Sequence, residues 1–86
     1  MENAQPIRCF IYRSRKKDGL YLFVTAEDDF SRVPAAVMSF FGQPERAMEL
    51  ELTPERRLAR ADAAEVIAKL NENGFYIQLP PPDPLL

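Results

Sequence analysis

Charged side chains, rather than any catalytic motif, are the residues of this sequence that could do chemistry. The segment Arg13-Ser14-Arg15-Lys16-Lys17 carries four positive charges in five residues. With Tyr12 and Tyr21 at its edges, this basic run combines cations that bind phosphates with rings that stack on nucleotide bases. The same run is also an ordinary solvent-exposed connector between two strands. We favour the connector and keep RNA binding as the alternative.

A second candidate is the acidic pair Asp28-Asp29. Adjacent carboxylates could hold a cation, or one could raise the pKa of the other. Carboxylates that precede a helix more often cap it and complement its dipole. We therefore expect Asp28 and Asp29 to organise the start of a helix rather than to bind a metal ion.

Nucleophilic and general-base catalysis have few residues to draw on. The sequence has no histidine, and Cys9 is its only cysteine. Cys9 shares a face with Ile7 and Ile11 in an alternating pattern, which predicts a packed core thiol and not a nucleophile. The three glycines are too scattered for a phosphate-binding loop. We expect a protein that is not an enzyme, with no cofactor, no metal and no small-molecule substrate.

Length, charge and cysteine content limit the class of protein. A chain of 86 residues can build one hydrophobic core. Its net charge of −2 argues against a domain whose main task is to hold a phosphate backbone. A single cysteine allows no internal disulfide, which favours a reducing compartment. The sequence shows no signal-peptide pattern and no apolar run near the roughly 20 residues that cross a bilayer, so we expect a cytoplasmic protein without a membrane partner.

The start of the chain predicts a β-hairpin. Ile7–Tyr12 and Leu20–Thr25 both alternate between two faces, and Asp18-Gly19 supplies a turn signal between them. Both faces of the two strands are apolar or aromatic, whereas a sheet with one wet face usually alternates apolar with polar residues. We therefore expect helices on both sides of the sheet. The alternative is that one aromatic face stays open for a ligand.

A helix is predicted from Val33 to Phe41. Ser31 or Asp29 can cap its start, Pro34 suits its first turn, and Gly42 ends it.

The second half of the chain predicts a weaker strand, a second helix and a last strand. The expected elements are, in order, a break at Gln43-Pro44, a strand over Ala47–Leu52, a turn or a single helical turn over 53–60, a helix over Ala63–Asn73 and a strand over Phe75–Leu79. Asp62 and Glu65 have the spacing of a capping box, and Asn73-Gly74 supplies a left-handed helix end.

These elements define an α+β fold: a single-domain α/β/α sandwich with a small, largely antiparallel sheet, formed by the hairpin plus two further strands, and two main helices. We divide the chain into an N-terminal tail at 1–6, an α/β domain at 7–79 and a proline-rich tail at 80–86. The segment Leu79-Pro80-Pro81-Pro82 either docks in an aromatic-lined groove of a partner or lies on its own domain. Whether Arg56, Arg57 and Arg60 lie near the basic run is left open by the sequence.

Several segments together resemble one known family. They are Cys9-Phe10-Ile11-Tyr12-Arg13-Ser14, Tyr21-Leu22-Phe23-Val24, Asp28-Asp29-Phe30-Ser31-Arg32-Val33-Pro34, Phe41-Gly42-Gln43-Pro44, Ala47-Met48 and Gly74-Phe75-Tyr76-Ile77-Gln78-Leu79-Pro80-Pro81-Pro82. In this order they resemble the YcgL domain family of small uncharacterised bacterial proteins. The resemblance implies an α/β/α sandwich with an antiparallel sheet. It supplies no activity and no site residues, and family members with longer C-terminal tails exist.

We expect a non-enzymatic adaptor or regulatory domain that binds another macromolecule, with a protein as the leading candidate partner. The candidate partner-binding residues are Asp28, Asp29, Arg32, Gln43, Gln78, Pro80, Pro81 and Pro82. The alternative is an RNA-binding accessory domain. Its candidate residues are Arg13, Arg15, Lys16, Lys17, Tyr12 and Tyr21.

Overall fold

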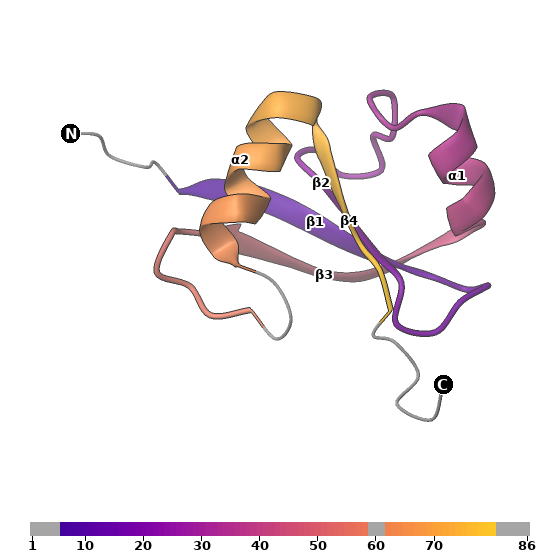
Figure 1. The fold of residues 1–86 in the computed structure, drawn as a ribbon, viewed down its shortest axis with the longest axis horizontal. Helices are drawn as coiled ribbons and strands as arrows, with labels where there is room; N and C mark the ends of the chain where they lie inside the picture. The colour runs from indigo at the N-terminus through magenta and orange to yellow at the C-terminus, as the bar shows by residue number, and fades with distance from the viewer. Residues whose placement is uncertain (1–5, 59–61, 81–86) are drawn as a thin grey trace.

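The computed structural model describes residues 6–58 and 62–80, which form four strands and two helices (Figure 1). The elements are β1 (Ile7–Ser14), β2 (Tyr21–Val24), α1 (Ala35–Phe41), β3 (Pro44–Leu52), α2 (Ala63–Asn73) and β4 (Phe75–Gln78). All strand pairs are antiparallel, and the strand order in the sheet is β3-β1-β2-β4. The predicted fold class and the antiparallel sheet are confirmed.

The two faces of the sheet carry two separate apolar cores, because side chains alternate along each strand. One core joins Cys9, Ile11 and Phe23 to the buried side of α2. The core on the opposite face contains Tyr12, Leu20, Leu22, Val24, Val33 and Phe41, with α1 packed against it. The prediction of a helix on each side is confirmed. Figure 1 shows that α2 and α1 lie near opposite ends of β1.

Ser14 fixes the turn of the predicted hairpin. Its backbone N–H donates to the Leu20 carbonyl at 3.0 Å. Its buried hydroxyl accepts the N–H groups of Lys16 and Lys17, both at 3.0 Å, and donates to the Phe41 carbonyl at 2.6 Å. The Ser14 side chain thereby orders the loop between β1 and β2, which carries Arg15, Lys16 and Lys17 of the basic run and is called the basic loop below. It also connects this loop to the end of α1.

Strand β3 starts earlier than predicted, at Pro44 instead of Ala47. We expected Gln43-Pro44 to break the chain, but β3 is an edge strand, where a proline without an N–H is tolerated. The pairing with β1 shifts register between Ile11, opposite Met48, and Tyr12, opposite Arg46. Ala47 is therefore the extra residue of a β-bulge.

Helix α1 begins at Ala35, two residues later than predicted, and Pro34 occupies its N-cap without a side-chain cap. The predicted caps are occupied elsewhere: the Asp29 carboxylate accepts the Ser31 N–H at 3.1 Å, within the loop before the helix. The expectation that Ser31 or Asp29 caps α1 is wrong, because the loop forms its own turn first.

Helix α2 matches the predicted range of Ala63–Asn73. Gly74 adopts a left-handed conformation with φ of 86°, and its N–H donates to the Leu70 carbonyl at 2.9 Å. The predicted C-terminal end is confirmed. At the other end Asp62 is the N-cap residue but its side chain makes no capping hydrogen bond, so the predicted capping box with Glu65 is wrong.

Candidate functional site

The basic run forms the tip of the β1–β2 hairpin, where its cations contact different groups. Arg13 Nε donates to Glu45 Oε1 at 3.1 Å, and this hydrogen bond lowers the pKa of Glu45 below its usual value. Lys16 Nζ donates to the Ser39 carbonyl at 3.2 Å. Lys17 Nζ lies 5.2 Å from the centroid of the Phe40 ring, within the range of a cation–π contact. The tip is therefore held against α1 and β3.

The two tyrosines of the RNA-binding hypothesis lie on opposite faces of the sheet. Tyr21 packs with the core beneath α2, and Tyr12 belongs to the core beneath α1. Only 2% of Tyr12 is exposed, and burial is the largest cause that raises its pKa. We expected Tyr12 or Tyr21 to stack on a base; for Tyr12 this is wrong, because its ring is enclosed by the core, whereas Tyr21 is only partly buried.

Arg56 and Arg57 do not join the basic loop. They lie in the segment that follows β3, whose last residue, Leu52, pairs with Ile7 at the start of β1. The basic loop follows the other end of β1. Arg60 falls outside the described residues.

The acidic pair does not form a joint site, because each carboxylate has its own structural role. The Tyr12 hydroxyl donates to Asp28 Oδ1 at 3.1 Å and accepts the Asp28 N–H at 2.7 Å. Asp28 has a φ of 58°, a left-handed conformation that costs energy in a residue other than glycine. Hydrogen bonds from Ser31 hold the pKa of Asp29 below its usual value. Within residues 6–58 and 62–80, no group of three or more His, Cys, Asp or Glu side chains is arranged to hold a metal ion.

The remaining predicted partner-binding residues are dispersed over the fold. Arg32 lies against Gly74, where an added Cβ would come within 2.9 Å of the arginine Cβ. The Gln43 carbonyl accepts the Arg15 N–H at 3.4 Å, next to the basic loop. Gln78 lies at the end of β4, and Pro80 follows it with a partly buried side chain. Pro81 and Pro82 lie outside the described residues, so the structure brings no joint site together from this set.

The structure instead shows an apolar hollow on the α2 face that the sequence reasoning missed. Its volume is about 270 Å³. The described residues that line it are Ile11, Tyr21, Phe23, Ala47, Met48, Leu50, Leu58 and Gln78. None of them comes from α2, so the hollow is the part of this face that the helix leaves uncovered. Met48 is 51% exposed there. A smaller hollow of about 220 Å³ lies between α2 and β4.

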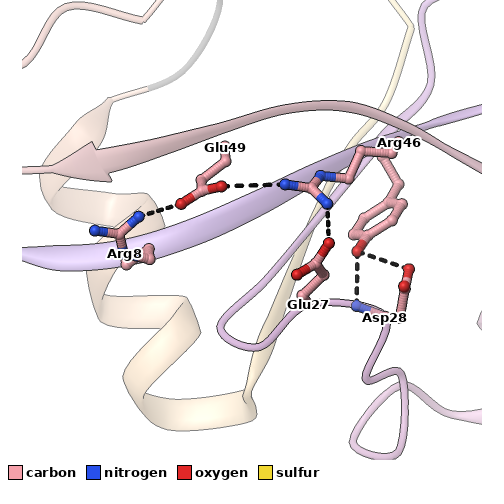
Figure 2. Close-up of polar contacts among 6 residues, drawn as sticks. Arg8, Glu27, Asp28, Arg46 and Glu49 are labelled. Carbon is pink, nitrogen blue, oxygen red and sulfur yellow. Dashed lines mark hydrogen bonds and ion pairs between the residues drawn. The ribbon is translucent and has the colours of Figure 1, made fainter.

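The other face of β3 is polar, and a chain of ion pairs runs across it (Figure 2). Arg8 pairs with Glu49, Glu49 pairs with Arg46 at 3.1 Å, and Arg46 pairs with Glu27. The Arg46 guanidinium also lies 5.3 Å from the centroid of the Phe10 ring. Strand β3 therefore presents an apolar, open side on the α2 face and a charged side on the α1 face, where Arg46 and Glu49 are ion-paired.

Cys9 is a core residue, as predicted. Its side chain is fully buried, and burial raises the pKa of the thiol to about 11, with Arg56 opposing the rise. The thiol is therefore protonated at neutral pH, and the thiolate is the nucleophilic form.

The fold and the hollow define a class: a small α+β domain whose antiparallel sheet is covered on one face and partly open on the other. Residues 9–81 match the family model described as YcgL domain. A YcgL domain-containing protein of Cellvibrio japonicus is 52% identical over 73 residues, covering 85% of this chain and 74% of the relative. Protein YcgL of Salmonella agona is 53% identical over 74 residues, covering 86% of this chain and 72% of the relative.

The chain belongs to the YcgL domain family. The resemblance found in the sequence is thereby confirmed. Over the described parts of the chain, neither helix has the length and apolar character needed to cross a membrane.

Proposed function

We propose that this chain is a non-enzymatic adaptor domain that binds another protein through the apolar hollow on the α2 face. The single observation that carries the proposal is the half-covered sheet face. A small domain gains stability by removing apolar surface from water, yet Met48 remains half-exposed beside Leu50 and Leu58. A partner side chain bound there would remove this apolar surface from water and extend the core that lies beneath α2.

The shape and lining of the hollow favour a protein partner over a small molecule. Its volume of about 270 Å³ is below the range of roughly 300–1,000 Å³ that is typical of ligand pockets. Among the described residues, none of the side chains that line it is charged, and Tyr21 and Gln78 are the lining residues with a polar side-chain group. Small-molecule sites usually add several convergent polar groups that fix the orientation of the ligand.

The residues that the sequence suggested as possible nucleophiles or metal ligands have structural roles, and this supports the non-enzymatic part of the proposal. Cys9 is packed and protonated in the core. Asp28 is hydrogen-bonded to Tyr12, and the Asp29 carboxylate accepts the Ser31 N–H in a turn. The lone, buried thiol also supports our inference that the protein works in the reducing cytoplasm, which cell fractionation would test.

Site-specific photo-crosslinking in cells tests the proposal. A photoreactive amino acid at Met48 should crosslink to a defined protein partner, whereas the same group at Ala64, exposed on α2, should not. In a pairwise binding assay with that purified partner, Met48→Lys should weaken the affinity at least about tenfold and Ala64→Lys should leave it unchanged. Absence of a specific crosslink at Met48, or equal effects of the two lysine variants, would contradict the proposal.

Binding of single-stranded RNA is a second candidate function, favoured by the exposed ring beside the basic loop. Phe40 is 44% exposed and lies under Lys17, so a cation and an aromatic face are adjacent at the hairpin tip. Such binding must weaken steeply as salt rises, because phosphate contacts release counterions. Loss of binding in Lys16→Glu/Lys17→Glu, with an unchanged melting temperature, would support this function. Salt-independent or absent binding would exclude it.

A further inference from the structure

Strand β3 has a free edge along the whole of its nine residues, within the part of the chain that the structure describes. It stands at the end of the sheet and pairs with β1 on one side only. The backbone N–H and C=O groups on the other side can therefore pair with another extended chain. Charged side chains and a bulge discourage such pairing in most proteins. Both are present here, yet an apolar hollow borders the same edge.

The hollow continues to this edge because of the alternation along β3. Met48 and Leu50 point to the α2 side and line the hollow, whereas Glu49 and Glu51 point to the opposite side. A strand added beside β3 would have the same alternation. Every second side chain of that strand would enter or border the hollow, and the residues between would lie next to the glutamates.

The charges along β3 indicate the chemistry of the added strand. β3 carries Glu45, Glu49 and Glu51 against a single arginine, Arg46. Glu45 and Glu49 are paired with arginines, whereas Glu51 is exposed and makes no ion pair among the described residues. The bulge puts Glu45 on the α2 face, opposite Arg13, whereas Glu49 and Glu51 share the α1 face. Basic side chains on the added strand would lie beside Glu49 and Glu51.

A second copy of this chain fits the edge poorly. In a symmetric antiparallel pair centred near Glu49, the glutamates of one copy would lie opposite or diagonal to those of the other. Like charges directly opposite each other on neighbouring strands are destabilising. In that register the charge pattern favours a different, basic partner over a second copy.

We propose that β3 accepts an extended segment of a partner protein in which apolar residues alternate with lysine or arginine. The segment joins the sheet as a fifth strand, its apolar side chains occupy the hollow, and its basic side chains face Glu49 and Glu51. This is the mode of recognition in which backbone hydrogen bonds give affinity and alternate side chains give specificity. The inference rests on the proposed function and names the chemistry of its partner.

Amide hydrogen exchange measured by NMR tests the inference directly. The probe is a ten-residue synthetic peptide of alternating valine and lysine with blocked ends. Two control peptides replace lysine with glutamate or place a proline at the centre. The valine–lysine peptide should bind and slow exchange at the β3 amides that face the free edge by at least about tenfold, without slowing exchange along β4. The control peptides should bind at least about tenfold more weakly.

Matched protein variants separate the apolar and the charged contributions. Met48→Lys places a charge in the hollow, and Glu51→Lys reverses the unpaired carboxylate; each should weaken peptide binding at least about tenfold. Glu55→Lys is the control, because it makes the same charge change at an exposed position beyond the strand and should leave binding unchanged.

The outcomes distinguish this inference from the proposed function. Peptide binding that perturbs Met48 without protecting β3 amides would overturn strand addition and leave the hollow as a binding site. Equal binding of the valine–glutamate peptide would overturn the basic chemistry of the partner. Concentration-dependent dimerisation that protects β3 would make a second copy the occupant and overturn the inference. Failure of the peptide, with a specific crosslink at Met48, overturns the inference alone; loss of that crosslink overturns the proposed function.

Discussion

Removal of one buried hydroxyl should measurably destabilise this fold. In Tyr12→Phe the ring keeps its place in the core, but Asp28 loses the group that donates to its carboxylate and accepts its N–H. A net hydrogen bond contributes roughly 0.5–1.5 kcal/mol, and more when one partner is charged. Because Asp28 is exposed and regains water, we take the lower part of this range for each bond. The expected loss is about 1–2 kcal/mol, or roughly 5–15 °C in melting temperature for a domain of this size.

The assay is urea unfolding of the wild type and of Tyr12→Phe, followed by a double-mutant cycle with Asp28→Gly. Glycine tolerates the left-handed backbone at position 28 and keeps its N–H, but it lacks the carboxylate. Tyr12→Phe should therefore cost less in the Asp28→Gly background than in the wild type, by about 0.5–1 kcal/mol. A loss below about 0.5 kcal/mol in the wild-type background would show that water replaces both bonds, and would refute this account of the loop.

Three further outcomes follow from contacts within the fold. Ser14→Ala should cost roughly 1–3 kcal/mol, because it leaves the Phe41 carbonyl and two loop N–H groups without their partner; a chemical denaturation curve equal to that of the wild type would contradict this. Gly74→Ala should destabilise by roughly 1–3 kcal/mol, since a Cβ there is strained at a φ of 86° and meets Arg32, and thermal unfolding measures the loss; an unchanged melting temperature would show that the loop yields freely. The third concerns pH: folding raises the pKa of Cys9 from 9.0 to about 11, so the folded protein keeps a proton that the unfolded chain releases between these values. This contribution is fully present below pH 9 and is lost as the pH rises through 11, by roughly 3 kcal/mol in total. The difference between wild type and Cys9→Ala isolates it, and a pH-independent difference would contradict the raised pKa.

The parts of the fold that local patterns dictate could be predicted from the sequence. Alternation of apolar residues located the hairpin, and the Asn73-Gly74 pair located the end of α2. The start of β3 was missed because Pro44 is a poor strand residue unless the strand lies at an edge, and position within a sheet is not a local property. The start of α1 was predicted two residues too early, because the Asp29 carboxylate accepts the Ser31 N–H within the preceding loop and does not cap the helix.

The candidate site depended on contacts that no local pattern encodes. Ile11, Met48 and Gln78 come from three strands, and the strand order alone brings them around one hollow. The sequence showed that both strand faces are apolar, but it did not show that α2 is too short or too displaced to cover all of one face. The signal that was present is the alternation of Met48 and Leu50 with glutamates, which we interpreted only as a weaker strand.

The strand order also has a consequence for synthesis on the ribosome. The two central strands lie within the first 24 residues, whereas the strand that flanks β2 begins only at Phe75. At about 5–20 residues per second, some fifty residues of translation separate them, or roughly 3–10 s. The hairpin therefore leaves the ribosome before the neighbour that completes its sheet. A chain stalled before Phe75 therefore exposes Leu22 and Phe23 along an unpaired edge, the kind of surface that chaperones bind and that aggregates when they are absent.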